Sequence, residues 1–379
     1  MPKLLIITTI QRTLRDFLLP YGDHFRSLGW QVDAMANVRD PYPVAEEHFD
    51  HFYAVDWGRN PLDPRNFGRT PRFIRELLER EKYDIVHVHT PVAAFVTRFA
   101  LRKLRAAGTV KVVYTAHGFH FFKGNSPLKN FVFLNLEKLA GRWTDHLIVM
   151  NREDFSAAQT HRIVPPEHLT LMPGIGIDLS KYSAASVTAE QIAAVRRELE
   201  LAPEDKYILM VAEFIPRKRH QDAIEALALT AEQQLHLVFA GSGPKMDEMR
   251  KLTAIKRVQS RCHFAGHRND IPVLLKGASA MLLPSQQEGL PRSIMEAMVM
   301  GIPVIGTNIR GTQDLLENGC GILYPIGDTR SLASIFAQAS SGDPSFDSCA
   351  QKAVTHVKKY DLSAVLHMHE KLYLEIMQG

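Results

Sequence analysis

Short runs of apolar, largely β-branched residues alternate along the chain with longer stretches in which apolar residues recur every three or four positions. Runs such as residues 3–8 and 84–90 are typical of buried strands, whereas stretches such as 71–82 and 92–108 have the period of amphipathic helices. Strands that are apolar along almost their whole length predict parallel sheets covered by helices on both faces. The alternation runs through two successive halves, which predicts two doubly wound α/β domains.

The two halves meet in a segment rich in Gly, Pro, Ser and Ala, at residues 171–191. A chain of 379 residues also exceeds the size at which a single core usually stops growing. The predicted organisation is an N-terminal domain at 1–178, a linker at 179–205, a C-terminal domain at 206–360 and a terminal helix at 361–379. Ligands of open α/β sheets bind outside the carboxyl ends of the strands, so we expect one in a cleft between the facing loops of the two domains.

Composition excludes several classes of protein. The formal net charge of +4 is small for this length and argues against a nucleic-acid partner. The three cysteines have neither paired nor metal-ligand spacing and fit a reducing compartment. No apolar stretch approaches the roughly 20 residues that span a bilayer. The sequence therefore predicts a soluble, cytoplasmic protein that is at most peripheral to a membrane.

The segment "SQQEGLPRSIMEAMVMGIPVIG", residues 285–306, carries the first chemical signal. Pro291 is predicted at the first position of a helix, so the amides around Gly289 and Leu290 belong to a helix start and suit a phosphate. A second amide-rich turn contains Gly241 and Gly243. Together with the basic triplet at 217–219, these turns fit a diphosphate.

Glu288 and Glu296 frame this helix start, and "EGLPRSIMEAM" resembles the Glu-x7-Glu signature of retaining glycosyltransferases of family 4. The segment "GIPVIGTNIRGTQDLLENGCGILYPIGD" is similar to the rest of that family's donor domain. "VYTAHGFHFFKG" and "LMPGIGID" resemble the branch that builds capsule, exopolysaccharide and O-antigen glycans. The resemblance covers nearly the whole chain. It implies the GT-B fold, two Rossmann-like domains facing across a cleft, with the C-terminal helix packing back on the N-terminal domain.

The resemblance also assigns roles to individual residues of the donor half. Glu288 is expected to bond hydroxyls of the donor sugar, Glu296 those of the ribose, and Lys218 the phosphates. One departure concerns Glu213, which stands where family members carry an arginine at the diphosphate. Arg217 or Arg219 would then supply the second cation. The implied donor-binding residues are Lys218, Arg217, Gly241, Gly243, Arg268, Gly289, Leu290, Pro291 and Glu296.

The base of the nucleotide is expected near His267 and Arg268, and the family branch favours uracil. In the N-terminal half His117 matches the family histidine that reaches the donor sugar beside the reacting carbon. The implied catalytic pair is therefore His117 and Glu288. The reaction is transfer with retention, in which the leaving phosphate takes the acceptor's proton on the same face. The expected donor is a UDP-sugar carrying a hexose or an N-acetylhexosamine.

No metal or other cofactor is expected. The chain contains no Asp-x-Asp motif, so amides and cations rather than a metal ion would neutralise the leaving diphosphate. His87 and His89 share one face of a strand, but two ligands are insufficient for a metal site.

Residues 85–136 contain no Asp or Glu, although arginines and lysines recur there. Arg98, Arg102 and Arg105 share one face of a predicted helix, and Phe119 and His120 follow soon after. A basic helix beside aromatic residues suits anionic lipid headgroups or a lipid-diphosphate-linked glycan as acceptor, at the inner face of the cell membrane. An ordinary solvated helix face explains the same pattern.

Two other functions remain open. A nucleotide-sugar 2-epimerase has the same architecture, and a non-catalytic glycan-binding homologue would tolerate Glu213. Incubation with a nucleotide sugar separates the three by transfer or slow hydrolysis, by epimer formation, or by no reaction.

Overall fold

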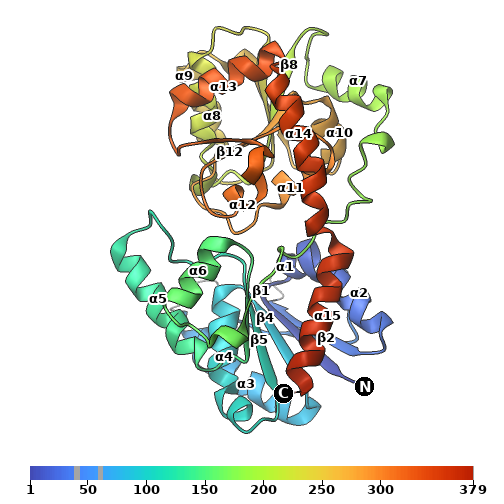
Figure 1. The fold of residues 1–379 in the computed structure, drawn as a ribbon, viewed down its shortest axis with the longest axis vertical. Coiled ribbons are helices and arrows are strands. Elements are labelled where there is room, and N and C mark those ends of the chain that lie inside the picture. Colours follow the sequence, from blue (N-terminus) through green and yellow to red (C-terminus); the bar gives the residue numbers. More distant parts are fainter. Residues whose placement is uncertain (38–42, 59–62, 379) are drawn as a thin grey trace. The chain divides into compact units, whose positions relative to one another are not determined.

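The computed structural model describes residues 1–37, 43–58 and 63–378 (Figure 1). The chain forms two compact units, one of Met1–Gly176 with Leu362–Gly379 and one of Ile177–Asp361. Residues 179–205, predicted as a linker, lie in the second unit and include helix α7 (Ala189–Glu198). The chain thus passes between the units twice, after Gly176 and after Asp361.

The first unit is built on a seven-stranded parallel sheet with the order β3-β2-β1-β4-β5-β6-β7. Its strands are β1 (Lys3–Ile10), β2 (Gln31–Asn37), β3 (Phe52–Ala54), β4 (Ile85–His89), β5 (Lys111–Ala116), β6 (His146–Val149) and β7 (Leu169–Leu171). Its helices are α1 (Gln11–Thr13), the π-helical turn η1 (Leu14–Leu18), α2 (Leu19–Ser27), α3 (Arg69–Glu81), α4 (Pro91–Ala106), α5 (Pro127–Gly141), α6 (Arg152–Thr160) and α15 (Leu362–Gln378). The strand order reverses between β1 and β4.

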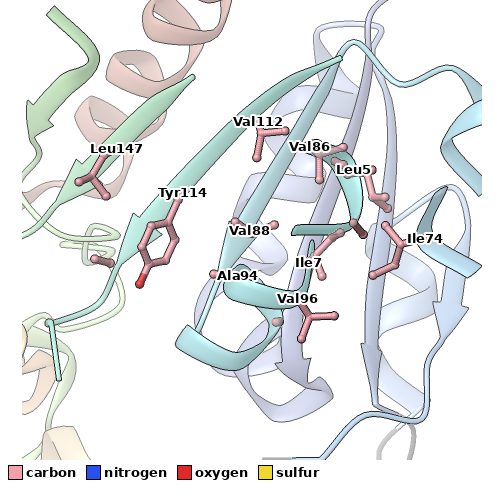
Figure 2. Packing of buried hydrophobic residues seen from close by; sticks show 14 of the residues in the cluster. Leu5, Ile7, Ile74, Val86, Val88, Ala94, Val96, Val112, Tyr114 and Leu147 are labelled. Atoms are coloured by element: carbon pink, nitrogen blue, oxygen red, sulfur yellow. The ribbon is translucent and has the colours of Figure 1, made fainter. Parts of the chain in front are cut away.

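Alternating side chains of these strands fill two separate cores. Leu5 and Ile7 pack with Val86 and Val88 on one face, beneath α3 and α4 (Figure 2). The intervening residues of β1 belong to the core on the other face, which α15 helps to cover through Leu366, Leu372 and Tyr373. The C-terminal helix therefore packs on the N-terminal unit, as predicted.

The second unit has a six-stranded parallel sheet with the order β10-β9-β8-β11-β12-β13. Its strands are β8 (Lys206–Val211), β9 (Leu235–Ala240), β10 (Cys262–Gly266), β11 (Ala280–Leu283), β12 (Val304–Thr307) and β13 (Ile322–Tyr324). Besides α7, its helices are α8 (His220–Leu229), α9 (Met246–Ile255), α10 (Ile271–Gly277), α11 (Arg292–Val299), α12 (Thr312–Leu316), α13 (Thr329–Ser341) and α14 (Pro344–Val357). Two cores cover the two faces of this sheet. The predicted pair of doubly wound sheets is confirmed.

Among the residues that the structure describes, no helix combines the length and the apolar character needed to cross a bilayer.

Candidate functional site

The strand order of the second sheet reverses between β8 and β11, and a crevice forms where the loops that follow such a pair diverge. The loop after β8 leads into the 3₁₀ turn η6 (Pro216–Lys218), and the loop after β11 carries Glu288. The amide of Gln286 donates to the carbonyl of Arg217 at 2.8 Å, which joins the two loops. The loops that carry Lys218 and Glu288, two of the predicted site residues, therefore meet at the switch point of the sheet.

Lys218 and Glu288 form an ion pair at this point. The Lys218 Nζ atom lies 2.5 Å from Oε1 of Glu288, and the Arg217 Nη1 atom lies 3.7 Å from Oε2. The Glu288 side chain is only 8% exposed and that of Lys218 14%, so the pair is largely removed from water. Two cations face one carboxylate, which leaves a positive local charge suited to an anion.

Helix α11 begins beside this pair. Pro291 has extended dihedral angles and is the N-cap, so the first helical residue is Arg292, one position later than predicted. No acidic residue lies in the first turn, and no side chain caps it. The first amides of a helix have no acceptor within it and carry the positive end of its dipole. The helix start thus has the features that the predicted phosphate site requires, namely uncapped amides and no acidic residue in the first turn.

Glu296 is buried within α11. It accepts a hydrogen bond from the Tyr182 hydroxyl at 2.6 Å and pairs with Arg292 at 3.2 Å. Burial raises the pKa of Glu296, although both partners oppose this shift. Sequence reasoning missed Tyr182 because it lies 114 positions away in a loop without any recognisable motif.

Arg310, in the loop after β12, is a second residue that the sequence did not predict at the site. Its side chain is buried, and its Nε atom donates to the carbonyl oxygen of Glu288 at 3.2 Å. Gly311 follows with a φ of +73°, and a Cβ atom there would lie 2.1 Å from the carbonyl oxygen of Gly289. The loop after β12 thus packs tightly on the loop that carries Glu288 and fixes its course.

The turn with Gly241 and Gly243 differs from the predicted phosphate loop. The Gly241 amide donates to the carbonyl of Gly266 at 2.7 Å and is not available to a phosphate. A Cβ atom at Gly241 would lie 2.0 Å from the Ala212 carbonyl oxygen, and one at Gly243 would lie 2.7 Å from the Phe214 amide nitrogen. The two glycines therefore allow this turn to pack against the loop after β8.

Two predicted binding cations are held by carboxylates. Arg219 makes two hydrogen bonds to Asp222, of 2.6 and 2.8 Å. Arg268 bonds Asp270 and Glu198, which connects α7 to the loop after β10. Of the two substitutes proposed for the missing family arginine, Arg217 is thus the one beside Glu288. His267 and Glu213 are both exposed.

In the first unit His117 follows β5, and its Nε2 atom lies 3.0 Å from Nδ1 of His89. Burial lowers the pKa of His117 to about 4, so the ring is neutral at pH 7. Phe119 was expected at the acceptor surface, but this expectation is wrong. Its side chain is buried and stacks on Phe121, with ring centroids 4.7 Å apart. His120 is exposed, and its ring lies 5.2 Å from that of Phe133.

A mainly apolar cavity of about 620 Å³ lies at the carboxyl ends of β1 and β4, between α4 and α5. Its lining includes Ile10, Thr90, Phe95, His120, Phe133 and Leu136. Thr90 has a φ of +66°, unusual for a β-branched residue, and its hydroxyl bonds that of Thr9 at 2.7 Å. The strained residue lies where the strand order of the first sheet reverses, so this edge has the features of a binding site.

The expectation that Arg98 belongs to a basic surface of α4 is wrong, whereas Arg102 and Arg105 are partly exposed. Arg98 is 1% exposed, pairs with Glu137 of α5 at 3.0 Å and lies over the ring of Tyr114. Arg102 lies over the ring of Phe99, and Arg105 pairs with Asp145 at 3.1 Å. Arg98 is covered by α5 and cannot reach a membrane surface. The acid-free stretch ends one residue before the carboxylate that neutralises Arg98.

In the described part of the chain, no three His, Cys, Asp or Glu side chains are grouped so that they could hold a metal ion.

Comparisons with known proteins show which family the chain resembles. Residues 21–181 match the family model described as Glycosyltransferase Family 4, and residues 191–356 match the model Glycosyl transferases group 1. The chain is 34% identical over 336 residues to EpsD of Bacillus subtilis, whose name assigns it to the glycosyltransferases; the match covers 87% of this chain and 85% of EpsD. It is 31% identical over 274 residues to the UDP-Gal:alpha-D-GlcNAc-diphosphoundecaprenol alpha-1,3-galactosyltransferase of Escherichia coli, covering 70% of this chain and 68% of that enzyme.

A similar fold occurs in the crystal structure of Anabaena HepE in complex with UDP and glucose. The two chains have a TM-score of 0.83 at 19% identity, over 99% of this chain and 100% of HepE. At this identity the likeness shows the fold.

Proposed function

Because the chain belongs to glycosyltransferase family 4, we propose that it transfers a hexose or an N-acetylhexosamine from a UDP-sugar to a lipid-diphosphate-linked glycan during synthesis of a surface polysaccharide. The observation that carries the proposal is the buried pair of Lys218 and Glu288 beside the first turn of α11. The E. coli relative acts on a diphosphoundecaprenol-linked sugar, and HepE binds UDP, which supports this choice of acceptor and donor.

The second unit would bind the nucleotide diphosphate. The amides at the start of α11 and the ammonium group of Lys218 meet its phosphate oxygens, with Arg217 as the second cation. Glu296 accepts hydrogen bonds from the ribose hydroxyls, and Tyr182 and Arg292 hold its carboxylate in place. Glu288 accepts from hydroxyls of the donor sugar. Arg310 fixes the backbone from which Glu288 projects.

The transfer step breaks the bond between the sugar C1 atom and the diphosphate oxygen. The acceptor hydroxyl attacks C1 from the same face, so the anomeric configuration is retained, and its proton passes to the leaving phosphate. Lys218, Arg217 and the α11 amides stabilise the negative charge that grows on the diphosphate. His117 stays neutral at pH 7 and contributes a hydrogen bond to the sugar rather than a charge. This division requires neither a protein base nor a metal ion.

The proposal is tested with purified protein, a panel of UDP-sugars and a synthetic lipid-diphosphate-linked sugar as acceptor. One UDP-sugar should release UDP with formation of an α-linked product, at equal rates with and without EDTA. A ligand at 100 times its dissociation constant stabilises a protein by about 2.7 kcal/mol, so the same sugar should raise the melting temperature most. Epimer formation would favour the epimerase, and binding without any product the glycan-binding homologue.

Contact with a membrane is proposed through α5 rather than α4. Leu128, Phe131, Val132 and Leu139 of α5 are between 41 and 73% exposed, although all are large and apolar. Leu128, Phe131 and Val132 have the i, i+3, i+4 spacing of one helix face, and exposed lysines lie nearby at 129 and 138. An apolar helix face with lysines nearby suits an anionic bilayer surface. The enzyme would thereby work at the inner face of the cell membrane, where its acceptor is anchored.

Replacing both Leu128 and Phe131 by serine should lower the fraction bound to phosphatidylglycerol-containing vesicles by about tenfold or more, because each large side chain buries apolar area on insertion. Sedimentation with vesicles measures the bound fraction. Ile255→Ser is the matched control, since Ile255 is 75% exposed but lies in the second unit. Equal sedimentation of the double variant and the wild type would remove α5 as the membrane contact.

A further inference from the structure

Three histidines follow one another at the carboxyl edge of the first sheet. His87 and His89 are two positions apart in β4 and lie on the same face, with ring centroids 4.1 Å apart. The ring centroids of His89 and His117 are 5.2 Å apart. His87 and His89 are almost completely buried, whereas His117 is partly exposed. The row thus runs from the interior of the first unit to the residue assigned to the donor sugar.

The inner histidine is fully satisfied. The Nδ1 atom of His87 bonds the hydroxyl of Tyr373 on α15, and its Nε2 atom lies 2.7 Å from the hydroxyl oxygen of Thr115. His87 therefore needs nothing from its neighbours. Its fixed ring forms one wall of the space that His89 occupies.

His89 has a different set of contacts. Its Nδ1 atom lies 3.0 Å from Nε2 of His117, while its Nε2 atom is buried and meets no partner among the described residues. Burial lowers the pKa of His89 and of His117, so each ring carries a single proton at neutral pH.

The hydrogen-bond partners of the two rings decide which nitrogen carries this proton. A buried N–H without an acceptor is rarer and more destabilising than a buried lone pair without a donor. The proton of His89 therefore belongs on Nδ1, from which it is donated to Nε2 of His117. Because Nε2 of His117 then accepts, the proton of His117 must lie on its own Nδ1 atom. That Nδ1 atom has no hydrogen-bond partner in the described part of the chain.

We infer that His89 is a positioning residue for His117: it holds His117 in the Nδ1–H form and turns that N–H toward a hydroxyl of the donor sugar. The role of His117 toward the sugar rests on the proposed function, whereas the tautomer rests on the hydrogen bonds and the burial of the two rings. His89, which by its spacing from His87 suggests half of a metal site, thus acquires a different function.

The test uses the shapes of the two carboxamide side chains. The amide nitrogen of asparagine can occupy the place of a histidine Nδ1 atom, whereas that of glutamine falls near Nε2. His89→Asn should therefore keep kcat within about threefold of the wild type. His89→Gln and His89→Leu should lower kcat by about tenfold, the effect of one lost hydrogen bond, with little change in KM for the UDP-sugar. Equal losses in all three variants, at equal melting temperatures, would overturn the inference.

A second measurement does not depend on catalysis. Nitrogen-15 NMR of histidine-labelled wild-type protein, with the His117 signals assigned by their absence from His117→Gln, should show a protonated Nδ1 and an unprotonated Nε2 atom. The opposite pattern overturns the inference even if the enzyme is active. A wild-type protein that transfers no sugar overturns the proposed function instead, and the NMR pattern still decides the tautomer.

Discussion

Replacing Glu288 by glutamine should lower kcat/KM for sugar transfer by about 10²–10³-fold while UDP binds at least as tightly as to the wild type. Glutamine keeps the size of the side chain but removes its charge and one acceptor oxygen. The donor sugar loses the carboxylate that we assign to its hydroxyls. The diphosphate, by contrast, gains, because Lys218 no longer has a carboxylate 2.5 Å away that competes for its ammonium group.

Replacing Lys218, the other partner of the ion pair, should have the opposite effect on UDP binding. Lys218→Met removes a charge-assisted contact to the diphosphate, so the affinity for UDP should fall by about 10–100-fold. Isothermal titration with UDP measures this effect, and initial rates with the UDP-sugar measure transfer. Glu232→Gln, at an exposed site of the same unit, is the control for Glu288→Gln because it also removes one negative charge. Weaker UDP binding in Glu288→Gln would contradict the assignment of Glu288 to the sugar.

Much of the fold was predictable because its signals are local. The apolar strands and the turns that follow them occupy short stretches, and the parallel order of a doubly wound sheet brings their carboxyl ends to one edge. This is why Lys218 and Glu288, 70 positions apart, could be assigned to one site from their motifs and are found in contact.

The errors arose where a local pattern does not specify what covers it. Helical spacing predicts that Arg98, Arg102 and Arg105 share one face of α4, but it cannot indicate that α5 covers Arg98. The partner that neutralises Arg98 lies 39 positions away on α5. The prediction for Phe119 was wrong for a related reason, because an aromatic residue that follows a strand can either be buried or line a site.

The site residues that the sequence did not predict lie far along the chain from the residues that they contact. Tyr182 reaches Glu296 from an irregular segment, and Arg310 acts on a backbone carbonyl, which leaves no trace in a motif. The sequence shows His89, but its spacing from His87 suggests only a metal ligand. Its contact with His117 depends on the register that sets β4 beside β5.

Replacing His117 by phenylalanine should lower kcat by about 10²–10³-fold and leave the affinity for UDP within about threefold of the wild type. Phenylalanine keeps a ring in the same space but has no nitrogen to donate to the sugar. UDP itself lacks the sugar, so its binding by the second unit should not depend on this residue. His367→Gln is the control, because His367 is an exposed histidine of the first unit. Near-normal turnover in His117→Phe would exclude a contact that matters in the transition state.

The pH dependence of kcat distinguishes how His117 acts. An unperturbed histidine has a pKa near 6.5, so an imidazolium that served as an acid would lose activity as the pH rises through about 6–7. Burial lowers the pKa of His117 to about 4, so the ring is already neutral across that range and should donate its N–H equally well throughout. The rate of the wild type should therefore be flat from about pH 6 to pH 8. A wild-type limb near pH 6.5 that disappears in His117→Phe would show that the ring reacts as a cation, and the neutral-donor mechanism would be wrong.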